Sequence, residues 1–196
     1  MTSTRTRGIV LGLLAALIAA VVIVVATSGG DDSTASASGT DRAFTADMIP
    51  HHKSAVEMAK IAKERSTRPE IQTLADDIIS AQDAEIGQMR SIDARLAAAG
   101  APKGKLAGAS MMGMGNESSL KTADPFDRAF IDMMIPHHQG AIEMARSELA
   151  SGADPETRKL ATAVITAQAG EIEKMNSYRK AWFGSVSPAG GVPPEK

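Results

Sequence analysis

The chain has 196 residues, a formal net charge of −2 and no cysteine. Without cysteine it can form no disulfide, no zinc–thiolate site and no iron–sulfur cluster, and it has no thiol nucleophile. Its charge is close to balanced and only 3% of its residues are aromatic, so it lacks the basic stripe and stacking side chains of a nucleic-acid-binding protein. Methionine is frequent, with 11 residues.

The N-terminal segment, residues 1–27, has the pattern of a membrane signal. Arg5 and Arg7 precede an uncharged and mostly apolar run at 8–27, and about 20 such residues are needed to cross a bilayer as a helix. The basic flank predicts the N-terminus inside and the rest of the chain outside. We therefore expect one transmembrane helix in the lipid bilayer of the cytoplasmic membrane. The alternative is a cleaved signal peptide, which would make the protein secreted.

Residues 28–40 are rich in small and polar side chains and are expected to form a flexible linker. Within residues 41–184, four patterns at about 41–65, 69–99, 124–152 and 154–184 repeat apolar residues at steps of three and four, as helices do. Pro50 is expected to kink the first helix or to start a new one. No stretch alternates as a strand, so we predict an all-α four-helix bundle.

Two segments outside the helical patterns complete the chain. A crossover at 101–123 joins the second helix to the third and contains Met111, Met112 and Met114. These thioethers are either accessory donors for a soft monovalent metal or part of a linker that packs on the bundle. The tail at 185–196 contains three prolines and is expected to be disordered.

The bundle sequence is written twice. The string Met-Ile-Pro-His-His at 48–52 returns at 134–138, which is 86 residues later, and these two strings contain all four histidines. The same offset relates residues 41–97 to residues 127–183 without a gap. The bundle therefore consists of two duplicated helical hairpins, and we expect its function in what both copies have kept.

The histidines continue the apolar stripes of the first and third helices, so at least one of each pair is expected to point into the bundle. A methionine precedes each pair by three residues and another follows it by seven, close to the same helical face. A histidine on an apolar face is usually a core residue with a satisfied hydrogen bond. Here the adjacent pairs, their duplication and the flanking methionines favour metal binding. The predicted metal ligands are His51, His52, His137, His138, Met48, Met134, Met58 and Met144.

Polar side chains interrupt the apolar stripes of the second and fourth helices. They are Gln82, Glu85, Gln168 and Glu171. A buried carboxylate must be paired, hydrogen-bonded or bound to a metal. Three roles are open to the glutamates. They are metal ligands, partners that orient a ligating imidazole from outside the coordination sphere, or members of Glu–His hydrogen bonds with no metal at all. We favour the orienting role. Glu57 and Glu143 fall on another face and are expected to be solvated.

These motifs resemble the exported bacterial family called domain of unknown function 305. The resemblance rests on Asp-Arg-Ala-Phe, Met-Ile-Pro-His-His, Ala-Ile-Glu-Met-Ala and Gln-x-x-Glu-Ile-x-x-Met, and it covers residues 41–97 and 127–183. It implies a ferritin-like four-helix bundle that is exported or membrane-anchored, and some members are associated with periplasmic copper binding. By position the motif carries over the same eight histidines and methionines.

The first copy departs from the family string where Thr-Ala-Asp at 45–47 replaces Ile-Asp-Met at 131–133, so we do not expect equal metal affinity of the two copies. Both copies also depart from di-iron carboxylate bundles, which place a glutamate three residues before the histidine. Met48 and Met134 occupy that place here. Soft or borderline metals are therefore favoured over a di-iron centre.

Three functions fit the sequence. The favoured one is an extracytoplasmic copper-binding protein that sequesters or hands on the metal, with Cu(I) preferred and zinc or iron as alternatives. The second is a structural or interaction bundle at the cell surface, held by His–Glu hydrogen bonds without a metal. The third is a metal-dependent enzyme, which we disfavour because no Ser/His/Asp order, phosphate loop or nucleotide fingerprint is present.

Overall fold

The computed structural model describes residues 38–106 and 115–195, which belong to one compact unit at 34–196. The membrane segment predicted at 8–27 and the crossover methionines Met111, Met112 and Met114 lie outside the described residues. Within the described ranges, no helix combines the length and the apolar character needed to span a membrane.

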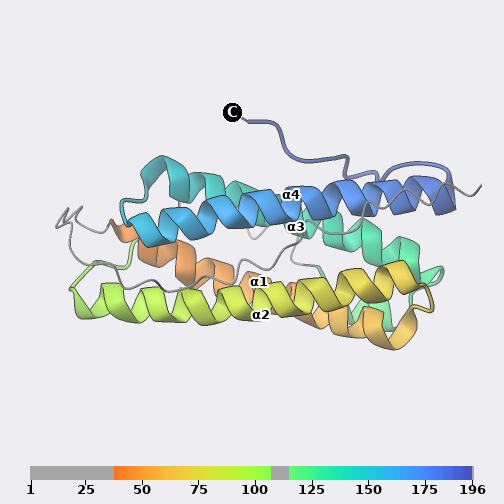
Figure 1. Ribbon diagram of the computed structural model, residues 1–196, viewed down its shortest axis with the longest axis horizontal. Coiled ribbons are helices and arrows are strands. Elements are labelled where there is room, and N and C mark those ends of the chain that lie inside the picture. The colour runs from red at the N-terminus through yellow and green to blue at the C-terminus, as the bar shows by residue number, and fades with distance from the viewer. Residues whose placement is uncertain (1–37, 107–114, 196) are drawn as a thin grey trace, which may run out of the picture. The chain divides into compact units, whose positions relative to one another are not determined.

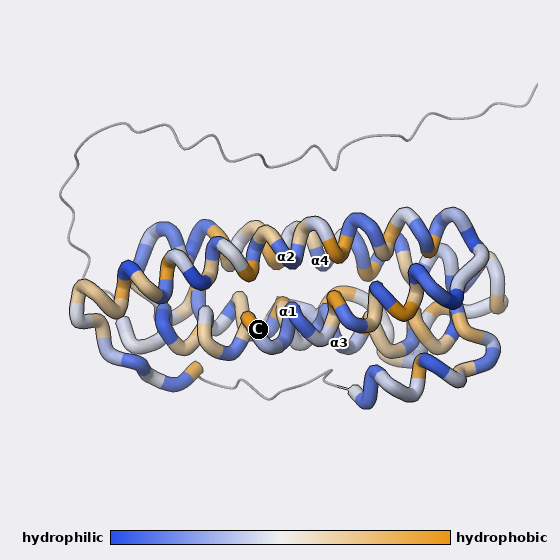
Figure 2. The backbone as a smooth tube through the Cα atoms, turned by 90° about the horizontal axis from the view of Figure 1, so that it is seen from below, coloured by the Kyte–Doolittle hydropathy of each residue, from blue (hydrophilic) through white to orange (hydrophobic). Residues whose placement is uncertain are grey.

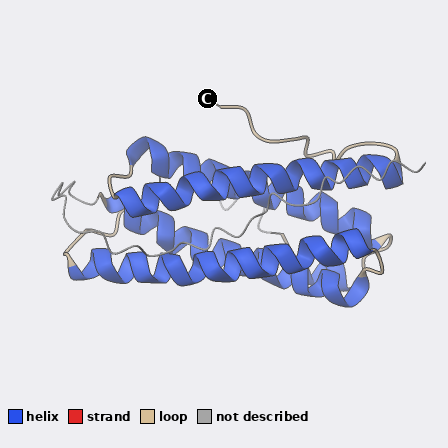
Figure 3. Cartoon of the chain, viewed as in Figure 1, coloured by secondary structure: helices blue, strands red, loops and turns tan. Residues whose placement is uncertain are grey.

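Four long helices account for most of the described chain: α1 (Gly39–Arg65), α2 (Pro69–Ala98), α3 (Phe126–Ser151) and α4 (Pro155–Phe183). A short 3-10 helix, η1 (Glu117–Lys121), lies in the crossover. The part of the chain that the structure describes contains no strand (Figures 1 and 3). For these described residues, the prediction of an all-α fold with four long helices is confirmed.

Local chemistry explains where these helices begin and end. Pro69 and Pro155 open α2 and α4, where a missing N–H costs nothing. The Asp154 side chain caps α4 by accepting from the Thr157 backbone N–H at 2.9 Å, and Gly184 ends it with φ of 82°, which a residue with a Cβ adopts only under strain. Contrary to one expectation, α1 runs through Pro50 as a single helix.

The helices form two hairpins, α1–α2 and α3–α4, that pack with α1 against α3 (Figure 1). α1 and α3 run in opposite directions. The Ser38 hydroxyl at the start of α1 donates to the Ser151 carbonyl at the end of α3, at 3.2 Å. At the other end of α1, Arg65 donates to the Ala123 carbonyl just before α3, at 3.0 Å. The two repeats therefore face each other through the helices that carry the histidines.

Apolar and polar positions alternate along every helix with a helical period (Figure 2), and the buried apolar residues form two separate clusters. The α1-start cluster contains Phe44, Ile92 and Val164. The α1-end cluster contains Ile71, Leu120 and Phe130. The histidines lie between the two clusters along α1 and α3. The core is thus divided by a polar layer near the middle of each helix.

The C-terminal tail differs from the expectation of disorder. Residues 185–195 lie against α3 and α4 through hydrogen bonds from Gln139, Arg146 and Asn176. Composition predicts whether a segment can form its own core, but it does not reveal donors on neighbouring helices that satisfy the segment's carbonyls. The tail is fixed by its docking surface rather than by its own residues.

Candidate metal centre

Each of the four helices contributes two side chains to the polar layer, which we call the histidine layer. These are His51 and His52 from α1, Gln82 and Glu85 from α2, His137 and His138 from α3, and Gln168 and Glu171 from α4. All four histidines are 0% exposed. The structure thus brings both histidine pairs together with the glutamates of the adjacent helices.

Two histidines form the same carboxylate pair in the two repeats. Nε2 of His52 lies 2.8 Å from Oε2 of Glu85, and Nε2 of His138 lies 2.7 Å from Oε2 of Glu171. The glutamate side chains are 18% and 11% exposed, so each carboxylate retains some contact with solvent. A carboxylate at Nε2 holds the ring orientation and favours the tautomer with hydrogen on that nitrogen, which leaves Nδ1 as the free lone pair.

The other two histidines meet across the repeats. The ring centroids of His51 and His137 lie 3.8 Å apart, with an angle of 38° between the ring planes. The ring of His138 lies 6.3 Å from that of His137. Because α1 and α3 come from different repeats, this contact places imidazoles from both copies at one point of the core.

Several polar atoms of the layer have no hydrogen-bond partner among the described residues. They include both ring nitrogens of His137, Nδ1 of His52 and His138, both amide atoms of Gln82, and Oε1 of Gln168. Buried polar atoms are nearly always satisfied by protein, water or an ion, since an unsatisfied one costs about 1–3 kcal/mol. These atoms are therefore the positions at which water, an ion or another ligand would be bound.

Burial lowers the pKa of His137 well below 6.5, and the neighbouring His51, His138 and His52 lower it further. Desolvation disfavours the imidazolium, and a second positive charge close by adds repulsion. The folded protein therefore keeps this imidazole neutral near pH 7. A neutral imidazole has the free lone pair that a metal ligand needs.

Methionines border the histidine layer on both sides. Met48 and Met144 belong to the α1-start cluster, while Met58 and Met134 belong to the α1-end cluster. Each side therefore receives one methionine that precedes a histidine pair and one that follows the pair of the other repeat. All four are at most 2% exposed.

Two further methionines, Met89 and Met175, join these clusters. They occupy equivalent positions in the two repeats, four residues after Glu85 and Glu171. In the sequence both lie on the apolar stripes of the second and fourth helices. The signal that identifies them is the offset of 86 residues combined with helical spacing from the glutamates, since one turn separates positions i and i+4.

The donor types in and beside the layer fit a soft metal better than a hard one. Within residues 38–106 and 115–195, no three histidine or carboxylate side chains are grouped to hold a metal ion. Imidazole nitrogen and thioether sulfur are the donors placed next to each other along α1 and α3. Such a set suits Cu(I), whereas carboxylate-rich sets suit magnesium, calcium or manganese.

Acidic residues outside the layer have other partners. Glu57 pairs with Lys60 at 2.9 Å, and its side chain is 62% exposed. Asp132, which the first repeat lacks, accepts from the buried Arg179 at 2.7 Å. The departure of the first copy at 45–47 therefore affects an ion pair near the layer rather than a member of the layer itself.

The fold and this layer define a duplicated helical-hairpin bundle with paired histidines at its centre. The chain belongs to the family described as Domain of unknown function (DUF305), whose model matches residues 41–179. The family resemblance seen in the sequence is confirmed.

Solved structures of related proteins share this fold. CopM in its Cu(I)-bound form is 35% identical, with a TM-score of 0.63, and the match covers 74% of this chain and 98% of that chain. CopM also matches in Cu(II)-bound and Ag-bound forms. A DUF305 protein from Streptomyces coelicolor that is predicted to be secreted is 27% identical, with a TM-score of 0.65, over 76% of this chain and 96% of that chain.

Among curated proteins, the uncharacterized protein L153 of Acanthamoeba polyphaga mimivirus is 44% identical over 52 residues. This match spans 26% of the chain and about a third, 34%, of the length of that relative.

Proposed function

We propose that this protein binds copper, preferentially Cu(I), outside the cytoplasm and sequesters the ion or hands it on. The ion is cargo in this account, and no reaction is required of the protein. The histidine layer would supply imidazole nitrogen from both repeats, and the buried methionines would supply thioether sulfur. CopM, 35% identical to this chain, is known in Cu(I)-bound and Cu(II)-bound forms, which supports copper over zinc or iron.

The observation that carries the proposal is the contact between His51 and His137 at 3.8 Å, next to unpartnered nitrogens of His137. The nitrogens of the neutral His137 imidazole would otherwise be polar atoms in a dry core, at a cost. A metal ion that accepts a lone pair from this ring, beside His51 of the other repeat, would remove that cost. On this basis the two repeats share one site.

Two observations support a location outside the cytoplasm: the basic flank and apolar run at the N-terminus, and a relative that is predicted to be secreted. An extracytoplasmic protein without cysteine can bind copper through histidine and methionine without the risk of thiol oxidation. Retention of residues 8–27 as a membrane anchor remains part of this proposal.

A structural bundle without metal is the second candidate, and one observation favours it. The pairs His52–Glu85 and His138–Glu171 connect α1 to α2 and α3 to α4, so they would fix the register of each hairpin without any ion. This candidate accounts for the glutamates. It leaves the unpartnered atoms of His137, Gln82 and Gln168 without a role.

Single substitutions separate a shared site from two independent ones. We would titrate Cu(I) against a competing chelator with residues 34–196 and with His51→Ala, His137→Ala and the control Glu57→Ala. A shared site loses its tight binding in either histidine variant and keeps it in the control. Loss of half the bound copper in each histidine variant would mean independent sites, and unchanged binding in both variants would exclude the histidine layer as the site.

A further inference from the structure

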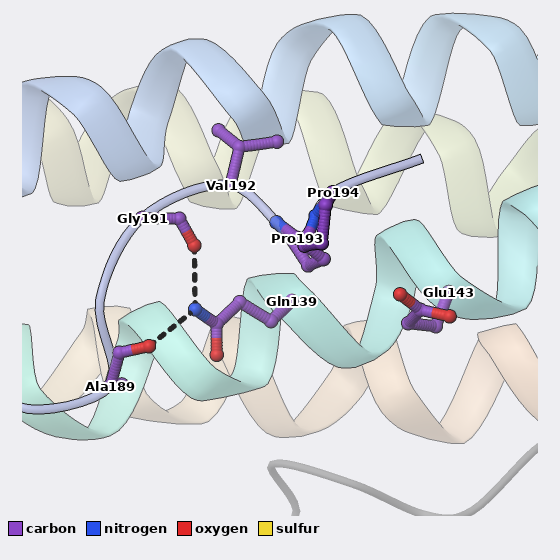
Figure 4. A pocket seen from close by; sticks show the side chains of 7 residues that line it. All are labelled: Gln139, Glu143, Ala189, Gly191, Val192, Pro193 and Pro194. Atoms are coloured by element: carbon purple, nitrogen blue, oxygen red, sulfur yellow. Dashed lines mark hydrogen bonds between the residues drawn. The ribbon is translucent and has the colours of Figure 1, made fainter. Parts of the chain in front are cut away.

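The last residues of the described chain dock onto the second repeat through their main-chain carbonyls. We call residues 188–195 the tail strap. Gln139 Nε2 on α3 donates to the Ala189 carbonyl at 2.9 Å and to the Gly191 carbonyl at 2.6 Å (Figure 4). Asn176 on α4 donates to the Gly190 carbonyl at 2.7 Å. Each donor therefore recognises peptide backbone rather than a particular side chain.

A second contact extends the strap along α3. The Arg146 guanidinium donates to the Pro193 carbonyl and to the Pro194 carbonyl, both at 2.9 Å. Proline residues restrict this stretch to extended conformations, so little conformational entropy is lost when it docks. Five consecutive or nearly consecutive carbonyls thus accept hydrogen bonds from three side chains of the second repeat.

The strap also buries apolar surface and encloses a hollow. Val192 packs against the α1-end cluster. Between the strap and α3 lies a hollow of about 330 Å³ that is lined by Gln139, Glu143 and residues 189–194 (Figure 4). The strap thus bridges α3 over open space rather than filling a groove, and its attachment depends on the named donors and on Val192.

The first repeat lacks two of these three donors. The positions equivalent to Gln139, Arg146 and Asn176 are Lys53, Lys60 and Arg90, and all three are exposed. Gln and Arg present planar amide or guanidinium N–H groups in fixed directions, whereas a lysine ammonium is a flexible point charge that stays hydrated. The repeats therefore differ in donor chemistry at the two positions on α3 where the strap docks.

We propose that the face of α3 and α4 bearing Gln139, Asn176 and Arg146 is a peptide-recognition surface for an extended Pro/Gly-rich segment, and that its occupant is this chain's own tail strap. The strap is an intramolecular ligand that covers the helix carrying His137 and His138. It is held by a few surface hydrogen bonds, so it opens more easily than the bundle does. This inference stands without any metal in the histidine layer.

Backbone relaxation measured by NMR on residues 34–196 tests the proposal, since this unit contains both hairpins and both core clusters and has the character of an independent domain. In the parent protein we expect order parameters of about 0.85 for the amides of residues 189–192, as in the helices. In the double variant Gln139→Lys/Arg146→Lys, which copies the first repeat, we expect them to fall below about 0.6. The matched control Lys53→Gln/Lys60→Arg keeps the parent values.

A peptide experiment tests recognition separately. A synthetic peptide of residues 188–196 is added to the 34–187 fragment. This fragment keeps Ser185, whose carbonyl accepts from Arg179, and Ser187, whose N–H donates to Asn176. We expect the peptide to shift the fragment's resonances at residues 139–146 and at Asn176, and to shift none in the intact 34–196 protein, whose surface is already occupied. In the relaxation experiment, a mobile strap in the parent or an equally ordered strap in the double variant would overturn the proposal. In the peptide experiment, shifts centred on residues 53–60, or no shifts at millimolar peptide, would overturn it.

Discussion

Glu148, near the end of α3, is a buried carboxyl group whose charged form is disfavoured. It is 0% exposed, and its carboxyl group lies beside the carboxyl group of Asp41. Burial, followed by the nearby Asp41 carboxylate, raises the pKa of Glu148 to about 8 from an ordinary 4.5; Arg158 lowers it and Asp154 raises it further. The first repeat has the buried Ala62 at the equivalent position. Folding and proton binding are therefore linked at this one residue.

The sign of the effect follows from the two pKa values. Below pH 4.5 both the folded and the unfolded protein hold the proton, and stability does not change. Between pH 4.5 and pH 8 only the folded state holds the proton. Each rise of one pH unit in this range therefore lowers the free energy of unfolding by up to about 1.4 kcal/mol. The whole interval gives an upper limit of about 5 kcal/mol, and relaxation with water penetration reduces this to about 2–3 kcal/mol.

Glu148→Gln removes the charge and keeps the shape. We expect the variant and the parent to have similar stability at pH 5, and the variant to be about 2–3 kcal/mol more stable at pH 8. The measurement is urea unfolding of residues 34–196, followed by circular dichroism at several pH values. Glu57→Gln, an exposed carboxylate on α1, serves as the control. Parallel stability curves for the parent and Glu148→Gln across this range would refute the reasoning.

Three other predictions concern the same end of α3 and the histidine layer. A Cβ at Gly152 would overlap the carboxyl group of Glu148, so Gly152→Ala should cost about 1–3 kcal/mol in thermal unfolding. Adding Glu148→Ala should recover most of this loss, and simple additivity of the two changes would contradict the contact. Glu85→Ala and Glu171→Ala should each weaken Cu(I) binding about 10-fold or more in chelator competition, whereas unchanged affinity would make these glutamates purely structural. In metal-free protein the lowered pKa of His137 stabilises the fold above pH 6.5. This stabilisation is lost as the pH falls below 6.5, because only the unfolded state then takes up the proton. Urea unfolding at pH 7 and pH 5 should show this loss in the parent and a smaller loss in His137→Gln, and equal losses would contradict the prediction.

The helices and the duplication could be predicted from the sequence because their signals are local. Apolar spacing at steps of three and four acts within one or two turns, and it predicts the ends of the four helices within a few residues. The pairing of His52 with Glu85 was also accessible, since both lie on apolar stripes of adjacent helices. The local rule that a proline interrupts a helix does not hold at Pro50. Packing of α1 on both neighbouring helices keeps the helix continuous despite the lost hydrogen bond.

The remaining features depend on contacts between segments far apart in the sequence. The contact of His51 with His137 requires that α1 and α3 lie side by side with their middles level, which duplication suggests but does not specify. The docked tail depends on Gln139, Arg146 and Asn176, whose partners are main-chain carbonyls that carry no sequence signature. Glu148 reads as an ordinary surface residue near a helix end until the Asp41 carboxylate is placed beside it.

The measurement that tests the central proposal most directly is the copper content and Cu(I) affinity of residues 34–196, compared with a variant in which all four histidines are changed to alanine. The proposal predicts tight, stoichiometric copper in the parent protein and its loss in a variant that circular dichroism shows to be folded. Copper no higher than background in the parent, or the same affinity in the folded variant, would contradict it and leave the histidine layer as scaffolding of the bundle.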